Sequence, residues 1–299
     1  MKKSGEALTL DGVCRAFLGK SVLKGVSARA RRGRVIGLLG RNGEGKSTLI
    51  SMILDILAAD AGRIEVLGRP LDGSGEIRRL VGYVPERPVF HDFMTVAQVF
   101  ELRRRFFPAW NPRKAASAAD RLGLDLQTRI AGASKGTLGK VAWVCATAHE
   151  PDLLLLDEPT SGLDALVRED VLNGLVGELQ SPDRTILVAN HHMEEFAGLL
   201  DEVWVLADGV ISGVHEMEAL RREACRLRGR LKKGRAVPPG LRVVPLTQEG
   251  SLVEWGALDA AAADQAAQAG VLENLERVSL TPSELFALLL RQAVGGSHV

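Results

Sequence analysis

The sequence predicts an α/β protein with a mostly parallel, doubly wound sheet, and two observations lead to this prediction. A short apolar run over residues 35–39 leads directly into a glycine-rich loop, and residues 47–57 then repeat apolar side chains at helical spacing. Between residues 153 and 206, short apolar runs alternate with helical patterns. Such alternation is typical of a parallel sheet that is covered by helices.

The remaining elements of this first unit follow from the same periodicities. Residues 7–13 and 22–28 alternate as the strands of a hairpin, which predicts an antiparallel β subdomain. Residues 88–149 have a helical pattern, so we expect an inserted helical subdomain there. Further short strands are expected over residues 63–66, 80–84, 153–156, 185–189 and 202–206, and helices over 95–106, 113–122, 135–148, 165–179 and 193–200.

A change in composition near residue 226 indicates a second, smaller unit. Six basic residues and two prolines follow, so we expect a first domain over 5–225, a linker over 226–240 and a small α+β domain over 241–299. The basic run is expected to be solvated, with contact to anionic lipid headgroups as the alternative. The last domain should hold strands over 241–247 and 251–255 and helices over 258–269 and 285–291, the second opened by a capping box at Thr281 and Glu284.

Composition excludes several classes of protein. A net charge of +1 over 299 residues argues against a general polyanion partner, so no nucleic acid is expected. The three cysteines lack metal-binding spacing and suit a reducing compartment. Glu6 soon follows the two N-terminal lysines, which argues against a signal peptide. No apolar run approaches the roughly 20 residues that cross a bilayer, so any membrane-spanning part is expected on another chain.

The glycine-rich loop carries the first chemical motif. Residues 40–48 read Gly-Arg-Asn-Gly-Glu-Gly-Lys-Ser-Thr and fit G-x-x-x-x-G-K-[ST], the P-loop that wraps nucleotide phosphates. Lys46 would reach the β- and γ-phosphates and Ser47 would bind Mg²⁺. Glu44 is expected to point outward, because a carboxylate beside phosphates is unfavourable. The candidate binding residues of the loop are Gly40, Asn42, Gly43, Gly45, Lys46, Ser47 and Thr48.

Two adjacent carboxylates form the second motif. Asp157 and Glu158 follow four leucines that read as a buried strand. Asp157 would hold Mg²⁺, and Glu158 would position or deprotonate the attacking water. Two surface acids at a strand end are the alternative, which the upstream P-loop disfavours. The two motifs together predict a magnesium-dependent nucleoside triphosphatase with a P-loop NTPase fold.

Two more segments lie close to the carboxylate pair. They read Ala-Ser-Lys-Gly-Thr at 133–137 and Ser-Gly-Leu-Asp at 161–164. With the two motifs above, they resemble the nucleotide-binding subunits of ABC transporters over roughly residues 7–224. This resemblance implies that the nucleotide is ATP. It also implies that Asp164 belongs to a D-loop, which contacts a partner subunit in the family.

Residues 133–137 stand where the family carries its LSGGQ signature. Ser134 and Gly136 match the signature, and the other three positions do not. The resemblance implies that the matching pair touches the γ-phosphate bound by the opposite subunit. Ser134 also suits the N-cap of a helix over 135–148, and the two roles are compatible.

Three more candidates rest on the resemblance. His191 matches the family's switch histidine, with His192 ranked second and an ordinary loop histidine as the alternative. Phe17 lies where the family stacks an aromatic ring on adenine, although it could equally be a core residue. Glu86 stands where the family usually has glutamine. It can still bind Mg²⁺, or it is simply a solvated loop acid.

The resemblance also implies an assembly. Two such chains, as a homodimer or heterodimer, would enclose ATP head to tail and drive an integral-membrane permease on a separate chain. The protein would then lie at the cytoplasmic face of the membrane, held by the permease. Residues 106–112 are apolar and aromatic, and they form either core or a docking surface for a permease helix. Together with the altered signature and Glu86, this stretch resembles the bacterial multidrug and antibiotic-resistance exporter branch.

Two other functions remain open at this level. A soluble ABC-type ATPase could act on nucleic acid or the ribosome, although such proteins usually carry two nucleotide domains or a long insertion. A regulatory ATP-binding subunit with weak turnover is the second alternative. The altered signature and Glu86 keep it open.

Overall fold

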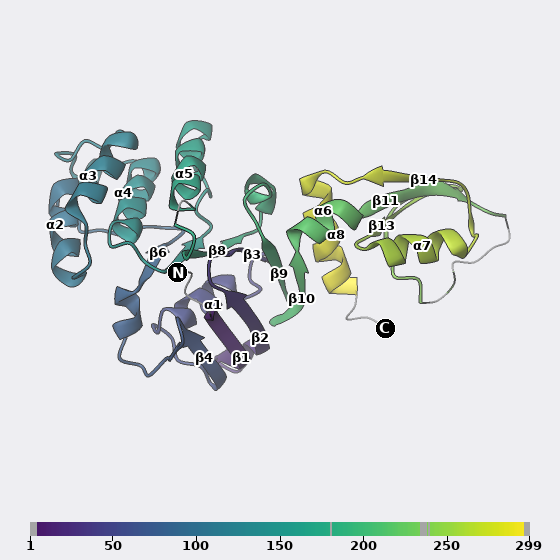
Figure 1. Cartoon of the computed structure of the whole chain (residues 1–299), viewed down its shortest axis with the longest axis horizontal. Helices are drawn as coiled ribbons and strands as arrows, with labels where there is room; N and C mark the ends of the chain where they lie inside the picture. The colour runs from purple at the N-terminus through teal and green to yellow at the C-terminus, as the bar shows by residue number, and fades with distance from the viewer. Residues whose placement is uncertain (1–4, 180, 234–237, 239, 296–299) are drawn as a thin grey trace.

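The computed structural model describes residues 5–179, 181–233, 238 and 240–295. Figure 1 shows its parts in a row along the longest axis. A helical group lies at one end, strands of two sheets occupy the middle and the C-terminal unit lies at the other end. No helix of the described ranges has both the length and the apolarity that a membrane span requires.

A six-stranded sheet forms the centre of the molecule, in the order β10-β9-β3-β8-β7-β6. The five strands from β9 to β6 are parallel, and β10 is antiparallel to β9. The predicted α/β class with a mostly parallel sheet is therefore confirmed. The strands are β3 (Val35–Leu39), β6 (Val81–Val84), β7 (Leu153–Asp157), β8 (Thr185–Asn190), β9 (Glu202–Ala207) and β10 (Val210–Glu216).

A second, antiparallel sheet packs against the first across helix α1 (Lys46–Ile53). Its strand order is β2-β1-β4-β5, and the predicted hairpin of the first two strands is present. Apolar side chains of both sheets and of α1 form one buried cluster, so the helix that follows the P-loop is fixed from two sides. The strands are β1 (Glu6–Phe17), β2 (Lys20–Arg31), β4 (Ala61–Val66) and β5 (Arg69–Pro70).

Two helices are shorter than predicted. The helix expected over 47–57 ends at Ile53, because Asp55 has a φ of 54° and the next two amides turn back to the Ser51 carbonyl. The helix expected over 193–200 is a 3₁₀ turn at Met193–Phe196. Its two apolar residues, Met193 and Phe196, are buried against the central sheet, so the sequence shows apolar periodicity without a full helix.

The helical group contains α2 (Val96–Phe106), α3 (Pro112–Arg121) and α4 (Lys135–Thr147). Helix α5 (Ala165–Glu178) contacts it and follows β7. Phe107 and Trp110 are buried in the main core, which favours the core interpretation of residues 106–112. Of the three aromatic residues in this stretch, Phe106 is exposed, with 63% of its surface accessible.

His149, between α4 and β7, is buried beside the Phe107 ring, with centroids 4.4 Å apart. Burial lowers its pKa from 6.5 to about 4, although its Nε2 atom lies 3.3 Å from the Val81 carbonyl. Below pH 6.5 the imidazole is protonated in the unfolded chain but stays neutral in the folded protein. We therefore expect the free energy of unfolding to fall by up to about 3 kcal/mol between pH 6.5 and 4.

The pH effect is measured by urea unfolding of the wild type and of His149→Gln across this range. Glutamine can still donate to the Val81 carbonyl but does not titrate. The difference in unfolding free energy between the two proteins should therefore shrink as the pH falls. A difference that is independent of pH would contradict the assignment.

The C-terminal unit is a four-stranded antiparallel sheet, in the order β12-β13-β11-β14. It differs from the prediction at residues 226–231, which were expected in a linker but form most of strand β11. Leu227 packs in the core of the unit, whereas Arg226 forms ion pairs with Glu254 and Glu284. Residues 234–237 and 239 of the predicted linker lie outside the described residues, and the domain boundaries stay predictions.

Helix α8 (Pro282–Gly295) joins this unit to the rest of the chain. Its capping box is present, because Thr281 and Glu284 exchange hydrogen bonds. Leu285 and Phe286 belong to the same buried cluster as Phe196 of the first unit. The other elements are α6 (Met217–Glu223), β11 (Cys225–Leu231), β12 (Val244–Glu249), β13 (Leu252–Ala257), α7 (Ala260–Gln268) and β14 (Leu272–Ser279).

Candidate functional site

The P-loop connects β3 to α1 and has the geometry of an anion site. Gly43 and Gly45 have φ values of 87° and 104°, which L side chains rarely adopt. A Cβ atom on Gly45 would also lie 2.8 Å from a methyl carbon of Leu23. The loop ends at the N-terminus of α1, where backbone amides and the helix dipole favour a negative charge.

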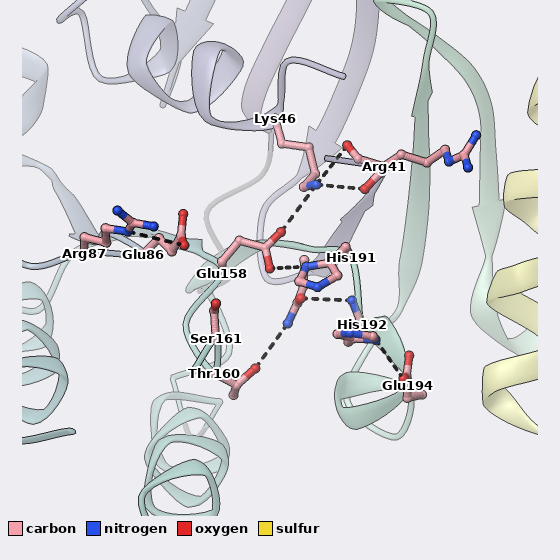
Figure 2. A network of polar contacts seen from close by, with 12 residues as sticks. Arg41, Lys46, Glu86, Arg87, Glu158, Thr160, Ser161, His191, His192 and Glu194 are labelled. Atoms are coloured by element: carbon pink, nitrogen blue, oxygen red, sulfur yellow. Dashed lines mark hydrogen bonds and ion pairs between the residues drawn. The ribbon is translucent and has the colours of Figure 1, made fainter. Parts of the chain in front are cut away.

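Lys46 is 94% buried, yet its ammonium is held in polar surroundings. Its Nζ atom donates to the carbonyls of Gly40 at 2.8 Å and Arg41 at 3.3 Å, and it lies 3.4 Å from Oε1 of Glu158. Figure 2 shows the lysine pointing toward this carboxylate from the opposite side of the site. The P-loop and the end of β7 therefore meet at this ion pair.

Glu158 is the centre of the polar network in Figure 2. Its Oε2 atom lies 2.6 Å from Nδ1 of His191, and its amide donates to the carbonyl of Ala189 at 2.8 Å. Its φ of 48° is rare for a residue with a side chain. Such backbone strain is typical of functional positions that the surrounding fold holds in place. Lys46 and His191 thus contact the two oxygens of one buried carboxylate, Lys46 at Oε1 and His191 at Oε2.

Asp157, at the end of β7, has an oxygen suited to a cation. The residue is 96% buried, and its Oδ1 atom has no hydrogen-bond partner within the described chain. Burial raises its pKa, and a hydrogen bond with Ser47 opposes that rise. The described residues hold no cluster of three or more His, Cys, Asp or Glu side chains that could bind a metal alone. Mg²⁺ needs only one or two protein ligands when phosphates and water complete its shell, so the residues present fit it.

A cavity of about 440 Å³ lies over these groups. Val22 and Ser161 also line it, although neither was predicted as a binding residue, since both reach the cavity only through the tertiary fold. Phe17 also lines it, with its ring half exposed beneath the Arg15 guanidinium. The predicted residues in the lining are Phe17, Asn42, Gly43, Gly45, Lys46, Ser47, Thr48, Glu86, Glu158 and His191.

The other predicted residues lie outside the cavity lining. Ser134 caps α4 by accepting from the Thr137 amide at 3.1 Å, and Asp164 caps α5 by accepting from the Val167 amide at 3.0 Å. Gly136 lies in the first turn of α4. Gly40 contributes the carbonyl that holds Lys46, and Asp157 is nearly covered.

The polar side chains around the cavity differ in their exposure. Glu44 turns away from the loop interior, as expected, and accepts from the Asp208 amide at 2.7 Å. Glu86 is partly exposed and lies 3.8 Å from Nε of Arg87. His192 is mostly exposed, with its Nδ1 atom 3.3 Å from Glu194. Of the two histidines, only His191 reaches the cavity.

Comparison with known proteins gives consistent matches. The family described as "ABC transporter" matches residues 23–161. The ABC transporter ATP-binding protein YtrB of Bacillus subtilis (strain 168) is 31% identical over 220 residues, which are 74% of this chain and 75% of that protein. The Nod factor export ATP-binding protein I of Bradyrhizobium sp. (strain SNU001) is 33% identical, over 74% and 73% of the two chains.

Solved structures agree with these matches. The ATP binding subunit of an ABC transporter has a TM-score of 0.66 and 27% identity, over 72% of this chain and 92% of that one. A dimeric ATP-binding cassette in a post-hydrolysis state, bound to ADP and phosphate, has a TM-score of 0.64. This match covers 70% of this chain and 98% of that one. At 21% identity, the second match supports the fold alone.

Proposed function

We propose that this chain, which belongs to the family of ABC transporter ATP-binding subunits, is the Mg²⁺-dependent motor of a permease on a separate chain. It binds and hydrolyses ATP, as the ATPases of this family do. The observation that carries the proposal is the meeting of Lys46, Glu158 and His191 at one cavity beside the P-loop. Cation, acid and phosphate-binding amides are the parts that phosphoryl transfer requires.

The residues divide the work of hydrolysis in a simple way. The P-loop amides and the Lys46 ammonium bind the phosphates, and charge-assisted hydrogen bonds fix their orientation. Glu158 orients the attacking water and accepts its proton, while His191 holds the other carboxylate oxygen. Asp157 and Ser47 would hold Mg²⁺, with Glu86 as a further ligand. When bound, the ion neutralises charge on the phosphate oxygens.

The active assembly is proposed to be a head-to-tail dimer, either of two copies or of related chains. The cavity of one chain is open, and Ser134 and Gly136 lie outside its lining. In the dimer these two residues of each chain would close the site of the other. Closure excludes water and strengthens the electrostatic contacts to the phosphates.

A second cavity supports docking of the permease. It has a volume of about 320 Å³ and an apolar lining that begins at Tyr83 and Pro85, beside Glu86. Val89 is in its lining, and nearby Phe93 is 72% exposed. We propose that a short helix of the permease fills this groove, so that its movement is linked to Glu86. The chain would then lie at the cytoplasmic face of the membrane.

Export is the proposed direction of transport. The relative from Bradyrhizobium is described as an export ATP-binding protein, and this chain is similar to it over most of its length. The test is to isolate the tagged chain from membranes in mild detergent and to identify what accompanies it. An integral-membrane protein that stimulates Mg²⁺-dependent ATP hydrolysis is the expected result. A chain that hydrolyses ATP but is isolated with no membrane protein would contradict the transport proposal.

A further inference from the structure

Lys135 connects the signature segment, residues 133–137, to a turn that borders the cavity of the same chain. This residue begins α4, and its Nζ atom donates to the Ser161 carbonyl at 2.5 Å. The next residue, Gly162, has a φ of 64°, and a Cβ atom there would lie 2.7 Å from the same Nζ atom. The Lys135 ammonium therefore lies directly over Gly162, where a larger residue would have to push the lysine aside.

The turn that Lys135 contacts is attached to the catalytic side of the site. Ser161 lines the ATP cavity, and its amide donates to the Glu158 carbonyl at 3.0 Å. Thr160, one residue earlier, accepts from the side chain of Asn190, which precedes His191. Movement of the turn would therefore displace the backbone that carries both catalytic side chains.

Stability of α4 does not account for a lysine at this position. The first turn of a helix is unfavourable for a cation, because the amides there carry partial positive charge. Among the described residues, Lys135 forms no ion pair that would offset this repulsion. Its one polar contact in the described chain is the Ser161 carbonyl. The role of the ammonium is therefore best sought in the turn.

We propose that Lys135 is a positioning residue that holds the 161–162 turn against the ATP cavity of its own chain. This inference rests on the proposed function, in which the signature segment faces the nucleotide of the opposite subunit. When the dimer closes on ATP, a shift of α4 would move the Lys135 ammonium and with it the turn that carries Ser161. Because this turn is hydrogen-bonded to Glu158, the Lys135 side chain would couple the two ATP sites of the dimer.

The competing role is a contact between the Lys135 ammonium and the phosphates of the opposite site. The two roles differ in the ligand-free chain, where no phosphate is present. The Lys135→Met variant keeps the length of the side chain and removes its charge. Lys140→Met is the matched control, because Lys140 lies in the same helix but pairs with Asp170 at 2.7 Å.

Hydrogen exchange of the ligand-free chain tests the contact directly. We expect the amides of Ser161 and Leu163 to exchange about tenfold faster in Lys135→Met, because the hydrogen bond from a charged donor to the turn is lost. Lys135→Arg should restore the protection, and Lys140→Met should leave it unchanged. Equal exchange in Lys135→Met and wild type would overturn the proposal.

Steady-state kinetics separates the two roles in the active protein. A positioning role predicts a fall in kcat of about three- to tenfold for Lys135→Met, with KM for ATP changed less than about twofold. A contact to the opposite phosphates would raise KM instead, and this outcome overturns the proposal. Absence of turnover in the wild type would contradict the ATPase function itself, so the two failures are distinguishable.

Discussion

Glu158→Gln is expected to lower the rate of ATP hydrolysis by about 10²- to 10⁴-fold, the range that general bases contribute. Glutamine keeps the size and the hydrogen-bonding ability of the side chain but cannot accept the proton of the attacking water. The P-loop amides and Lys46 are unchanged, so ATP should still bind. The measurements are phosphate release at saturating MgATP and equilibrium binding of ATP to the variant.

The control for this variant is Glu194→Gln. Glu194 is a carboxylate close to the site that pairs with His192 and does not line the ATP cavity. The Glu194→Gln variant should hydrolyse ATP at a rate within about twofold of the wild type, since surface ion pairs contribute little to stability. Equal turnover in wild type and Glu158→Gln would show that Glu158 is not the base.

The sequence allowed the central sheet to be predicted, and with it the meeting of the P-loop and the Asp157–Glu158 pair. Their signals are local, because the P-loop and the Asp157–Glu158 pair each lie where an apolar strand ends. Parallel strands carry their carboxyl ends to the same edge, so these two segments had to meet. The Lys46–Glu158 ion pair follows from that topology.

The features that sequence reasoning missed depend on contacts that are distant along the chain. Residues 226–231 of strand β11 were predicted as a linker, because basic residues such as Arg226 alternate with its few apolar ones. The glutamates that pair with Arg226, Glu254 and Glu284, come much later in the sequence. Ser161 was not predicted to line the cavity, because only the fold of the turn after β7 brings it there.

Lys46→Ala is expected to weaken ATP binding by about 10²-fold or more and to abolish hydrolysis, because loss of one partner from a buried charge pair typically costs 2–5 kcal/mol. The ammonium is the buried cation of the P-loop and pairs with Glu158. Without it, the carboxylate faces the incoming phosphates with only His191 to offset its charge. Calorimetric titration with a non-hydrolysable ATP analogue measures the affinity.

Lys46→Arg distinguishes geometry from charge at the same position. The lysine Nζ atom fits between two carbonyls and a carboxylate, all within 3.4 Å. A guanidinium is planar and larger, so it cannot occupy this point without displacing the loop. We therefore expect Lys46→Arg to hydrolyse ATP poorly although its charge is preserved. Normal turnover in this variant would mean that a nearby positive charge suffices, and that the position of the ammonium over the P-loop carbonyls does not determine catalysis.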